Sequence, residues 1–232
     1  LATFLSGFTS VCDWIGSDET YFVFEQNAID LSQYFEHTLV QADEAISALG
    51  WAGWQSREDV QSFADIFFTP NAMQRAVINQ VQRPETPPRL ILIEYPTGGG
   101  KTEIALYLAD LIINLFRMRG IYVAMPTQAT SNQMFGRVVE YLQQRYEGDA
   151  INLHLIHSQS QHQPSYSELM SQVDREGDES RVVAEKWFQN RRRSLLAPFA
   201  VGTIDQAMLS VLPTKHHFVR QFGLSHRVVI FD

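Results

Sequence analysis

The sequence has a single cysteine and no long apolar run. Cys12 has no partner for an internal disulfide, which is typical of proteins in a reducing cytoplasm. No run of about 18 apolar residues occurs, and even the apolar segment 101–120 is interrupted by Asp110, Asn114 and Arg117. Internal repeats and a signal-peptide pattern are also missing. We therefore expect a cytoplasmic protein with no membrane span.

An initial Met is missing too, and the sequence stops within an apolar run, residues 228–232, that predicts a strand. We therefore expect a piece of a longer protein. The 232 residues are enough for one α/β domain and an appendage, and 45% apolar with 19% charged residues is an ordinary globular composition.

Charge is unevenly distributed along the chain. Residues 1–65 hold eleven Asp or Glu against one Arg, whereas residues 66–232 hold fifteen against seventeen Lys or Arg, which gives −10 and +2. Residues 181–227 hold eight Lys or Arg and only two acidic residues. This basic segment is a candidate site for a polyanion, but a solvated basic helix explains it equally well. Its centre is the triplet Arg191, Arg192 and Arg193.

A glycine-rich loop follows one apolar run and precedes apolar residues at helical spacing. The loop, YPTGGGKT at residues 95–102, follows LILI at residues 90–93, which predicts a buried strand. This arrangement is typical of a phosphate-binding loop, so it predicts that the chain binds a nucleoside triphosphate. Lys101 can reach the β and γ phosphates, and the Thr102 hydroxyl can bind Mg²⁺. We expect the nucleotide to contact Thr97, Gly98, Gly99, Gly100, Lys101 and Thr102.

Further apolar runs alternate with helical segments after this loop. They predict an α/β fold, with a mostly parallel sheet that carries helices on both faces. Residues 1–65 instead predict an all-α segment, with a boundary near residue 65. Beyond residues 90–93, strands are expected at residues 121–125, 151–156, 199–202 and 227–232.

The carboxyl ends of parallel strands are where a nucleotide site forms. Asp232 follows the last apolar run, so its carboxylate is expected to hold Mg²⁺ as a Walker B aspartate, although an Asp that merely ends a strand remains an alternative. Two other strand ends lead into helices at Thr127 and Gln128, and at Thr203 and Gln206. Helix N-termini bind phosphates, but each of these alone is no better than a helix cap.

Taken in order, these segments resemble superfamily 2 helicases. The loop has Tyr95 where the general pattern has its first glycine, and it looks like the tighter P-T-G-x-G-K-T form of those motors. Gln74 matches a Q-motif glutamine, whose paired donor and acceptor could recognise adenine. The remaining matches are motif I at residues 95–102, motif Ia at residues 126–130, a later DNA-contact motif at residues 202–206 and the start of motif II at Asp232.

More closely, residues 125–135, 195–206 and 215–220 look like the CRISPR-associated helicase-nuclease of type I interference. Residues 12–17 resemble the closing segment of that family's HD nuclease domain, where Asp13 matches the last metal-side aspartate. An Asp that packs beside Trp14 explains this residue equally well.

The resemblance implies a metal-dependent nuclease joined to an ATP-driven motor that moves 3′ to 5′ on single-stranded DNA. A CRISPR surveillance complex would recruit it. Residues 1–65 would be the C-terminal tail of the HD domain plus a linker, and residues 66–232 the first RecA-like helicase domain, truncated at motif II. The implied cofactors are ATP, Mg²⁺ and a divalent transition metal in the missing part of the HD domain.

Within that enzyme, Lys101 and Asp232 would be catalytic, and Thr102 and Asp232 would hold Mg²⁺. The DNA would lie along Thr127, Gln128, Thr203, Gln206 and the arginine triplet 191–193. The chain alone is expected to be inactive, because the glutamate expected after Asp232 and the second motor domain are missing. Two alternatives stay open: a nucleotide-sensing module that binds a protein partner, and another superfamily 2 motor such as a restriction translocase.

Overall fold

The structure is a computed structural model. It describes residues 1–24, 30–52, 54–56, 62–81, 85–86, 90–148, 151–157, 160, 164, 166–167, 182–183, 186–190 and 192–232.

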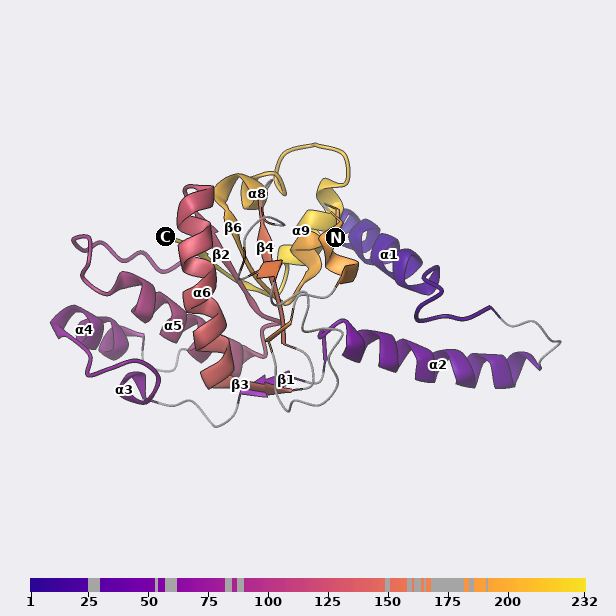
Figure 1. The fold of residues 1–232 in the computed structure, drawn as a ribbon, viewed down its shortest axis with the longest axis horizontal. Coiled ribbons are helices and arrows are strands. Elements are labelled where there is room, and N and C mark those ends of the chain that lie inside the picture. The colour runs from indigo at the N-terminus through magenta and orange to yellow at the C-terminus, as the bar shows by residue number, and fades with distance from the viewer. Residues whose placement is uncertain are drawn as a thin grey trace.

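Helices and strands alternate through most of the chain after residue 66 (Figure 1). The helices are α1 (Ala2–Gly16), α2 (Leu31–Ala48), α3 (Phe63–Ile66), α4 (Ala72–Gln80), α5 (Lys101–Phe116), α6 (Gln128–Arg145), α8 (Ile204–Met208) and α9 (His217–Leu224), with 3₁₀ turns η2 (Lys186–Gln189) and η3 (Ser194–Leu196). The strands are β1 (Trp54–Ser56), β2 (Ile121–Met125), β3 (Tyr146–Gly148), β4 (Ile151–Ile156), β5 (Val182–Val183), β6 (Phe199–Thr203) and β7 (Val228–Phe231).

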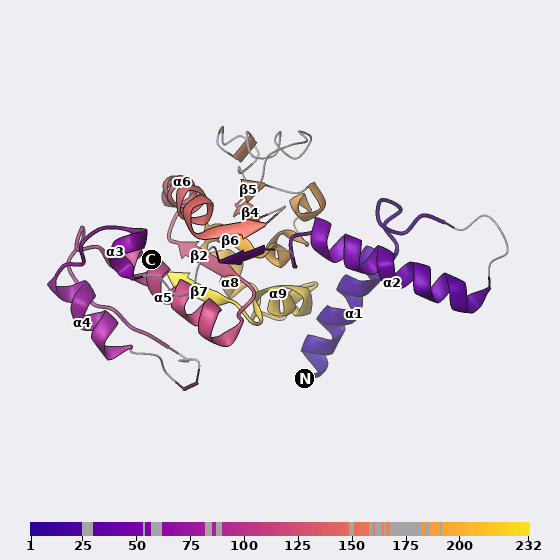
Figure 2. The ribbon, with the colours of Figure 1, turned by 90° about the horizontal axis from the view of Figure 1, so that it is seen from below.

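Five strands form one sheet in the order β5-β4-β6-β2-β7, and every neighbouring pair is parallel. The strands predicted at residues 121–125, 151–156, 199–202 and 227–232 are therefore confirmed, within a residue at their ends. In Figure 2, α6 and α9 lie on opposite sides of these strands. The predicted α/β fold with helices on both faces is confirmed.

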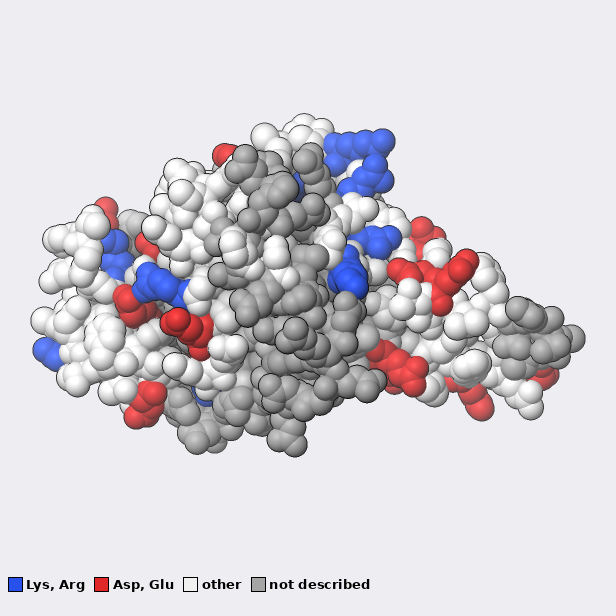
Figure 3. Space-filling view, in the orientation of Figure 1, with Lys and Arg blue, Asp and Glu red and all other residues white. Residues whose placement is uncertain are grey.

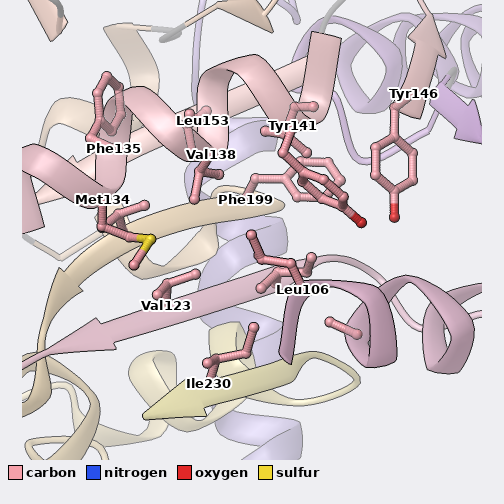
Figure 4. Close-up of a cluster of buried hydrophobic side chains, with 14 of the residues drawn as sticks. Leu106, Val123, Met134, Phe135, Val138, Tyr141, Tyr146, Leu153, Phe199 and Ile230 are labelled. Carbon is pink, nitrogen blue, oxygen red and sulfur yellow. The ribbon is translucent and has the colours of Figure 1, made fainter. Parts of the chain in front are cut away.

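Strand β2 shows how the two faces are covered. Ile121, Val123 and Met125 belong to the large core that also contains apolar residues of α5 and α6 (Figure 4). The alternate residues, Tyr122 and Ala124, pack in a second cluster with residues of α8 and η3. Because successive side chains of a strand point to opposite faces, a strand buried on both sides has an uninterrupted apolar sequence.

A buried ion pair ties the helix that follows the phosphate loop to the rest of the domain. Asp110 on α5 accepts hydrogen bonds from Arg145 Nε and from the Tyr146 hydroxyl, both at 2.9 Å. The side chains of Asp110 and Arg145 are 0% and 1% exposed. Removing one partner would leave the other charge buried and unpaired, which is strongly destabilising.

The N-terminal helices share a core with the sheet domain. Val11 of α1 and Leu49, just after α2, are buried with Trp187 and Phe188 of η2. At Gly7 a Cβ would lie 2.5 Å from Phe218 O, so only glycine allows this close approach of α1 to α9. The prediction that residues 1–65 are all-α is wrong at one point, because the short strand β1 lies within them and pairs antiparallel with β3. The boundary near residue 65 stays a prediction.

The strand predicted at residues 90–93 is wrong. These residues form no strand, and Leu90 and Leu92 are 84% and 77% exposed. Ile91 and Ile93 do pack against the large core. Residues 90–93 are therefore buried on one face only, whereas their uninterrupted apolar sequence predicted a strand buried on both faces.

His154 makes the stability of the fold dependent on pH. This residue of β4 is 1% exposed, and its Nδ1 hydrogen-bonds with the Tyr166 hydroxyl at 2.8 Å. Burial lowers the pKa of His154 from 6.5 to about 3, because desolvation disfavours the charged imidazolium. Below pH 6.5 the unfolded chain thus takes up a proton that the folded chain excludes until the pH nears 3.

We predict that the free energy of unfolding falls between pH 6.5 and 3 by up to about 1.4 kcal/mol per pH unit from this histidine. The variant His154→Phe, whose ring suits the neighbouring Phe188, should show a shallower pH dependence. Urea denaturation at a series of pH values measures both slopes. Equal slopes would contradict the prediction.

Candidate functional site

The glycine-rich loop bends through two left-handed residues before α5 begins. Gly98 and Gly100 have φ of +78° and +82°, values that glycine adopts without strain. Between them, Gly99 lies under the Tyr95 ring: a Cβ there would be 2.2 Å from Tyr95 Cδ1. Tyr95, at the position where the general pattern has glycine, therefore packs on the loop and requires glycine at residue 99.

Lys101, the first residue of α5, folds back over the start of the loop. Its Nζ donates to the carbonyl oxygens of Tyr95 (2.8 Å) and Pro96 (3.1 Å). The ammonium is thus held at the loop, near the helix N-terminus, where backbone N–H groups favour an anion.

Thr102 and Asp232, predicted as the magnesium residues, lie together although 130 positions apart in sequence. The Thr102 hydroxyl donates to Asp232 Oδ2 at 2.5 Å. The Asp232 N–H donates to Ala124 O, which holds the residue beside the end of β2. A hydroxyl and a carboxylate are hard oxygen donors of the kind that Mg²⁺ prefers, so these two side chains fit that ion.

Gln74, predicted to recognise adenine, is buried with 0% exposure. Its Oε1 accepts from the Asn71 N–H at 2.9 Å, and its Nε2 donates to Gly100 O at 3.0 Å. Asn71 in turn donates from Nδ2 to Gly99 O at 3.0 Å. Sequence reasoning missed Asn71, although Asn three residues before Gln is a capping-box signal.

The predicted DNA residues follow two paired strands. Because Met125 of β2 lies opposite Thr203 of β6, the segments after these strands leave the same edge of the sheet. Thr127 caps α6 by accepting from the Thr130 N–H, and Gln128 is the first residue of that helix. Thr203 is 8% exposed and precedes α8.

Gln206 of α8 accepts a hydrogen bond from Arg220 Nη1 at 3.1 Å. Arg220, on α9, is a further basic residue near this edge that the sequence analysis did not single out. The role of Gln206 as a DNA contact stays a prediction.

The members of the arginine triplet have different environments. Arg191 lies outside the described residues, and Arg192 is exposed. The Arg193 guanidinium lies over the ring of Trp187 at 4.5 Å and near that of Trp14 at 5.5 Å. Arg193 therefore joins α1 to the sheet domain, and only Arg192 among the described pair is free to face a solvent-borne partner.

Asp13 is exposed on α1. Across the part of the chain that the structure describes, no group of three or more His, Cys, Asp or Glu side chains could hold a metal ion. The metal role of Asp13 stays a prediction. Figure 3 shows that acidic side chains gather over the end of the molecule formed by α1 and α2.

One cavity within the described part of the chain lies away from the phosphate loop. It has a volume of about 590 Å³ and lies between α1, the end of α5 and α9, lined by aromatic residues such as Phe4 and Phe222 and by Arg117 and Arg119. None of the predicted site residues lines it. The predicted site therefore lies at the strand ends and not in this cavity.

The parallel sheet, the glycine loop at a helix N-terminus and the Thr102–Asp232 contact define a phosphate-loop nucleotide-binding domain with a RecA-like fold. No helix among the described residues is long and apolar enough to span a membrane.

Comparison with known proteins gives the family. The chain belongs to the family described as "Type III restriction enzyme, res subunit", whose model matches residues 67–232. It is also 40% identical over 231 residues to the CRISPR-associated endonuclease/helicase Cas3 of Thermus thermophilus. This alignment covers 96% of this chain and 25% of that protein. The resemblance to CRISPR-associated helicase-nucleases is thereby confirmed. The chain spans about a quarter of the length of this relative.

Comparison with solved structures gives the same family assignment. The crystal structure of T. fusca Cas3-ATP has a TM-score of 0.85 at 32% identity, and covers 99% of this chain and 25% of that one. A CRISPR RNA-guided surveillance complex, pre-nicking, matches with a TM-score of 0.61 at 27% identity, over 99% of this chain and 21% of that one. These matches include the N-terminal helices, which the restriction-family model does not cover. They favour the CRISPR-associated assignment over the restriction translocase and the nucleotide-sensing module.

The stacking of Arg193 leads to a prediction about stability. Arg193→Ala should lower the free energy of unfolding by about 1 kcal/mol through loss of the cation–π contacts, and it should loosen α1. The exposed Arg192→Ala is the matched control and should change stability little. Urea denaturation and amide hydrogen exchange of α1 measure both effects, and an equal loss in the two variants would contradict the assignment.

Proposed function

We propose that this chain is the nucleotide-binding part of an ATP-dependent motor that moves on single-stranded DNA and is joined to a metal-dependent nuclease in type I CRISPR interference. The observation that carries the motor assignment is the contact between Thr102 and Asp232 beside the phosphate loop. The identity to Cas3 across nearly the whole chain supports the CRISPR assignment.

In this proposal the N-terminus of α5 and the loop amides bind the nucleotide phosphates. Lys101 leaves its two carbonyl partners and places its ammonium on the β and γ phosphates. Thr102 and Asp232 hold Mg²⁺, directly or through water. When bound there, Mg²⁺ would supply positive charge to the phosphate oxygens. Such transfer depends almost entirely on positioning and charge neutralisation, which these residues supply from rigid elements.

The DNA would cross the edge of the sheet where β2 and β6 end. There Thr127 and Gln128 begin α6, and Thr203 and Gln206 border α8, so the backbone of a single strand meets two helix N-termini. Arg192 would extend the contact with its exposed charge. We further propose a surveillance complex as the recruiting partner, a cytoplasmic location, and a transition metal in a nuclease domain to which Asp13 and the helical segment 1–65 belong.

The nucleotide assignment is tested at Lys101. In the full-length protein, Lys101→Ala should reduce ATP turnover at least a hundredfold, since the loop loses its point charge on the phosphates. Lys101→Arg should also fail, because its planar fork has a different shape from an ammonium. Metal-dependent cutting of single-stranded DNA should persist. Phosphate release and DNA cleavage assays measure the two activities, and retained ATP turnover would refute the motor assignment.

The DNA path is tested through salt dependence. Arg192→Ala should weaken single-stranded DNA binding and reduce the slope of log K against log salt by about 0.7, the value for one phosphate contact on a single strand. Arg193→Ala, with its charge stacked on Trp187, is the control and should leave the slope unchanged. Binding titrations between 50 and 200 mM salt, a range in which such contacts respond strongly, give both slopes. An unchanged slope for Arg192→Ala would make it a solvated surface residue.

A further inference from the structure

Two amide side chains hold the phosphate loop from one side. Asn71 and Gln74 form a reciprocal cap of α4: Asn71 Oδ1 accepts from the Gln74 N–H, and Gln74 Oε1 accepts from the Asn71 N–H, both at 2.9 Å. Since an N–H must donate to oxygen, these bonds fix which end of each amide is oxygen. Both NH₂ groups therefore face the loop.

Each NH₂ group donates to a different carbonyl of the loop. Asn71 Nδ2 bonds Gly99 O and Gln74 Nε2 bonds Gly100 O, both at 3.0 Å. The contact with Gly100 is close, because a Cβ on this glycine would lie 2.4 Å from Gln74 Nε2 and 3.4 Å from Asn71 Nδ2. The amides thus occupy the volume that any larger residue at this position would need.

These two bonds fix the direction of two peptide groups. The peptides are trans, so the C=O of one residue and the N–H of the next point in opposite directions. With the carbonyls of Gly99 and Gly100 turned toward α4, the N–H groups of Gly100 and Lys101 turn away from it, at the open N-terminus of α5. Those first N–H groups of a helix have no intrahelical acceptor and are the ones that bind phosphate.

We propose that Asn71 and Gln74 are positioning residues of the nucleotide site, which act together as an amide clamp that points the loop N–H groups at the phosphates. The inference rests on the proposed nucleotide-binding function. It gives Gln74 an indirect role at the phosphates, through the loop that it holds, instead of recognition of adenine. The clamp acts on any nucleoside triphosphate. Its effect is on affinity and not on the choice of base.

The main variants alter Asn71, which is exposed. Asn71→Ser keeps a good N-cap oxygen but has no donor that reaches Gly99. Asn71→Asp also keeps the cap and turns the donor into an acceptor. In the full-length protein, both should weaken ATP and GTP by the same factor, roughly tenfold for one lost hydrogen bond, while the melting temperature stays near that of the unaltered protein. Fluorescent ATP and GTP analogues report the affinities.

Controls on the same helix are Asn79→Asp and Gln80→Glu, which place equal charge at exposed positions of α4 and should leave both affinities unchanged. Gln74→Glu removes the second donor, and it should weaken both nucleotides as Asn71→Asp does. In the double variant the loss should be smaller than the product of the single losses, because both donors act on one loop.

Three results would overturn the clamp. Unchanged nucleotide affinity in Asn71→Ser would mean that Asn71 only caps α4. A loss of ATP affinity with unchanged GTP affinity in Gln74→Glu would mean that Gln74 recognises adenine. Absence of nucleotide binding by the unaltered protein would refute the proposed function itself, and the clamp with it, whereas the first two results leave that function intact.

Discussion

Strand β2, which lies between β6 and β7, has no solvent-facing side, and the rest of the structure follows from that constraint. Parallel strands need long connections, and those connections return over the sheet as helices that cover it. Here α5 and α6 cover the face of Ile121 and Val123, and α8 with η3 covers the face of Tyr122. The same arrangement brings every strand end to one edge, so the site assembles as a consequence of burying the sheet.

The candidate phosphate site consists mostly of backbone groups of the glycine-rich loop. Side chains that contact this loop fix its conformation. Glycines at 98 and 100 take left-handed conformations, Tyr95 covers Gly99, and two amides from α4 hold the next carbonyls. Asp232 reaches Thr102 because β7 pairs with β2 up to its last residue. The loop, the two amides that hold it and the Thr102–Asp232 contact thus bring residues 71–102 together with Asp232, far along the chain.

Local sequence patterns predicted the elements whose formation depends on neighbouring residues: most strands of the sheet and the glycine-rich loop. Uninterrupted apolar runs predicted β2, β4, β6 and β7, and three consecutive glycines predicted the tight loop that precedes α5. The apolar run at residues 90–93 failed because burial on both faces requires neighbours that the run does not specify. The β1–β3 pair joins residues some ninety positions apart and has too few residues for a periodic signal. Arg193 likewise carries the same charge as Arg192 in the sequence, and only the surrounding tryptophans separate a stacked arginine from an exposed one.

The aromatic packing between α1 and the sheet domain has a spectroscopic consequence. Of the four tryptophans, Trp14, Trp51 and Trp187 lie in the core that α1 shares with the sheet domain, and Trp54 packs on Phe199 at 4.9 Å. The phosphate loop contains none. Tryptophan fluorescence of this chain is therefore an optical reporter of how the N-terminal helix sits on the sheet domain, and events confined to the phosphate loop would be nearly silent in it.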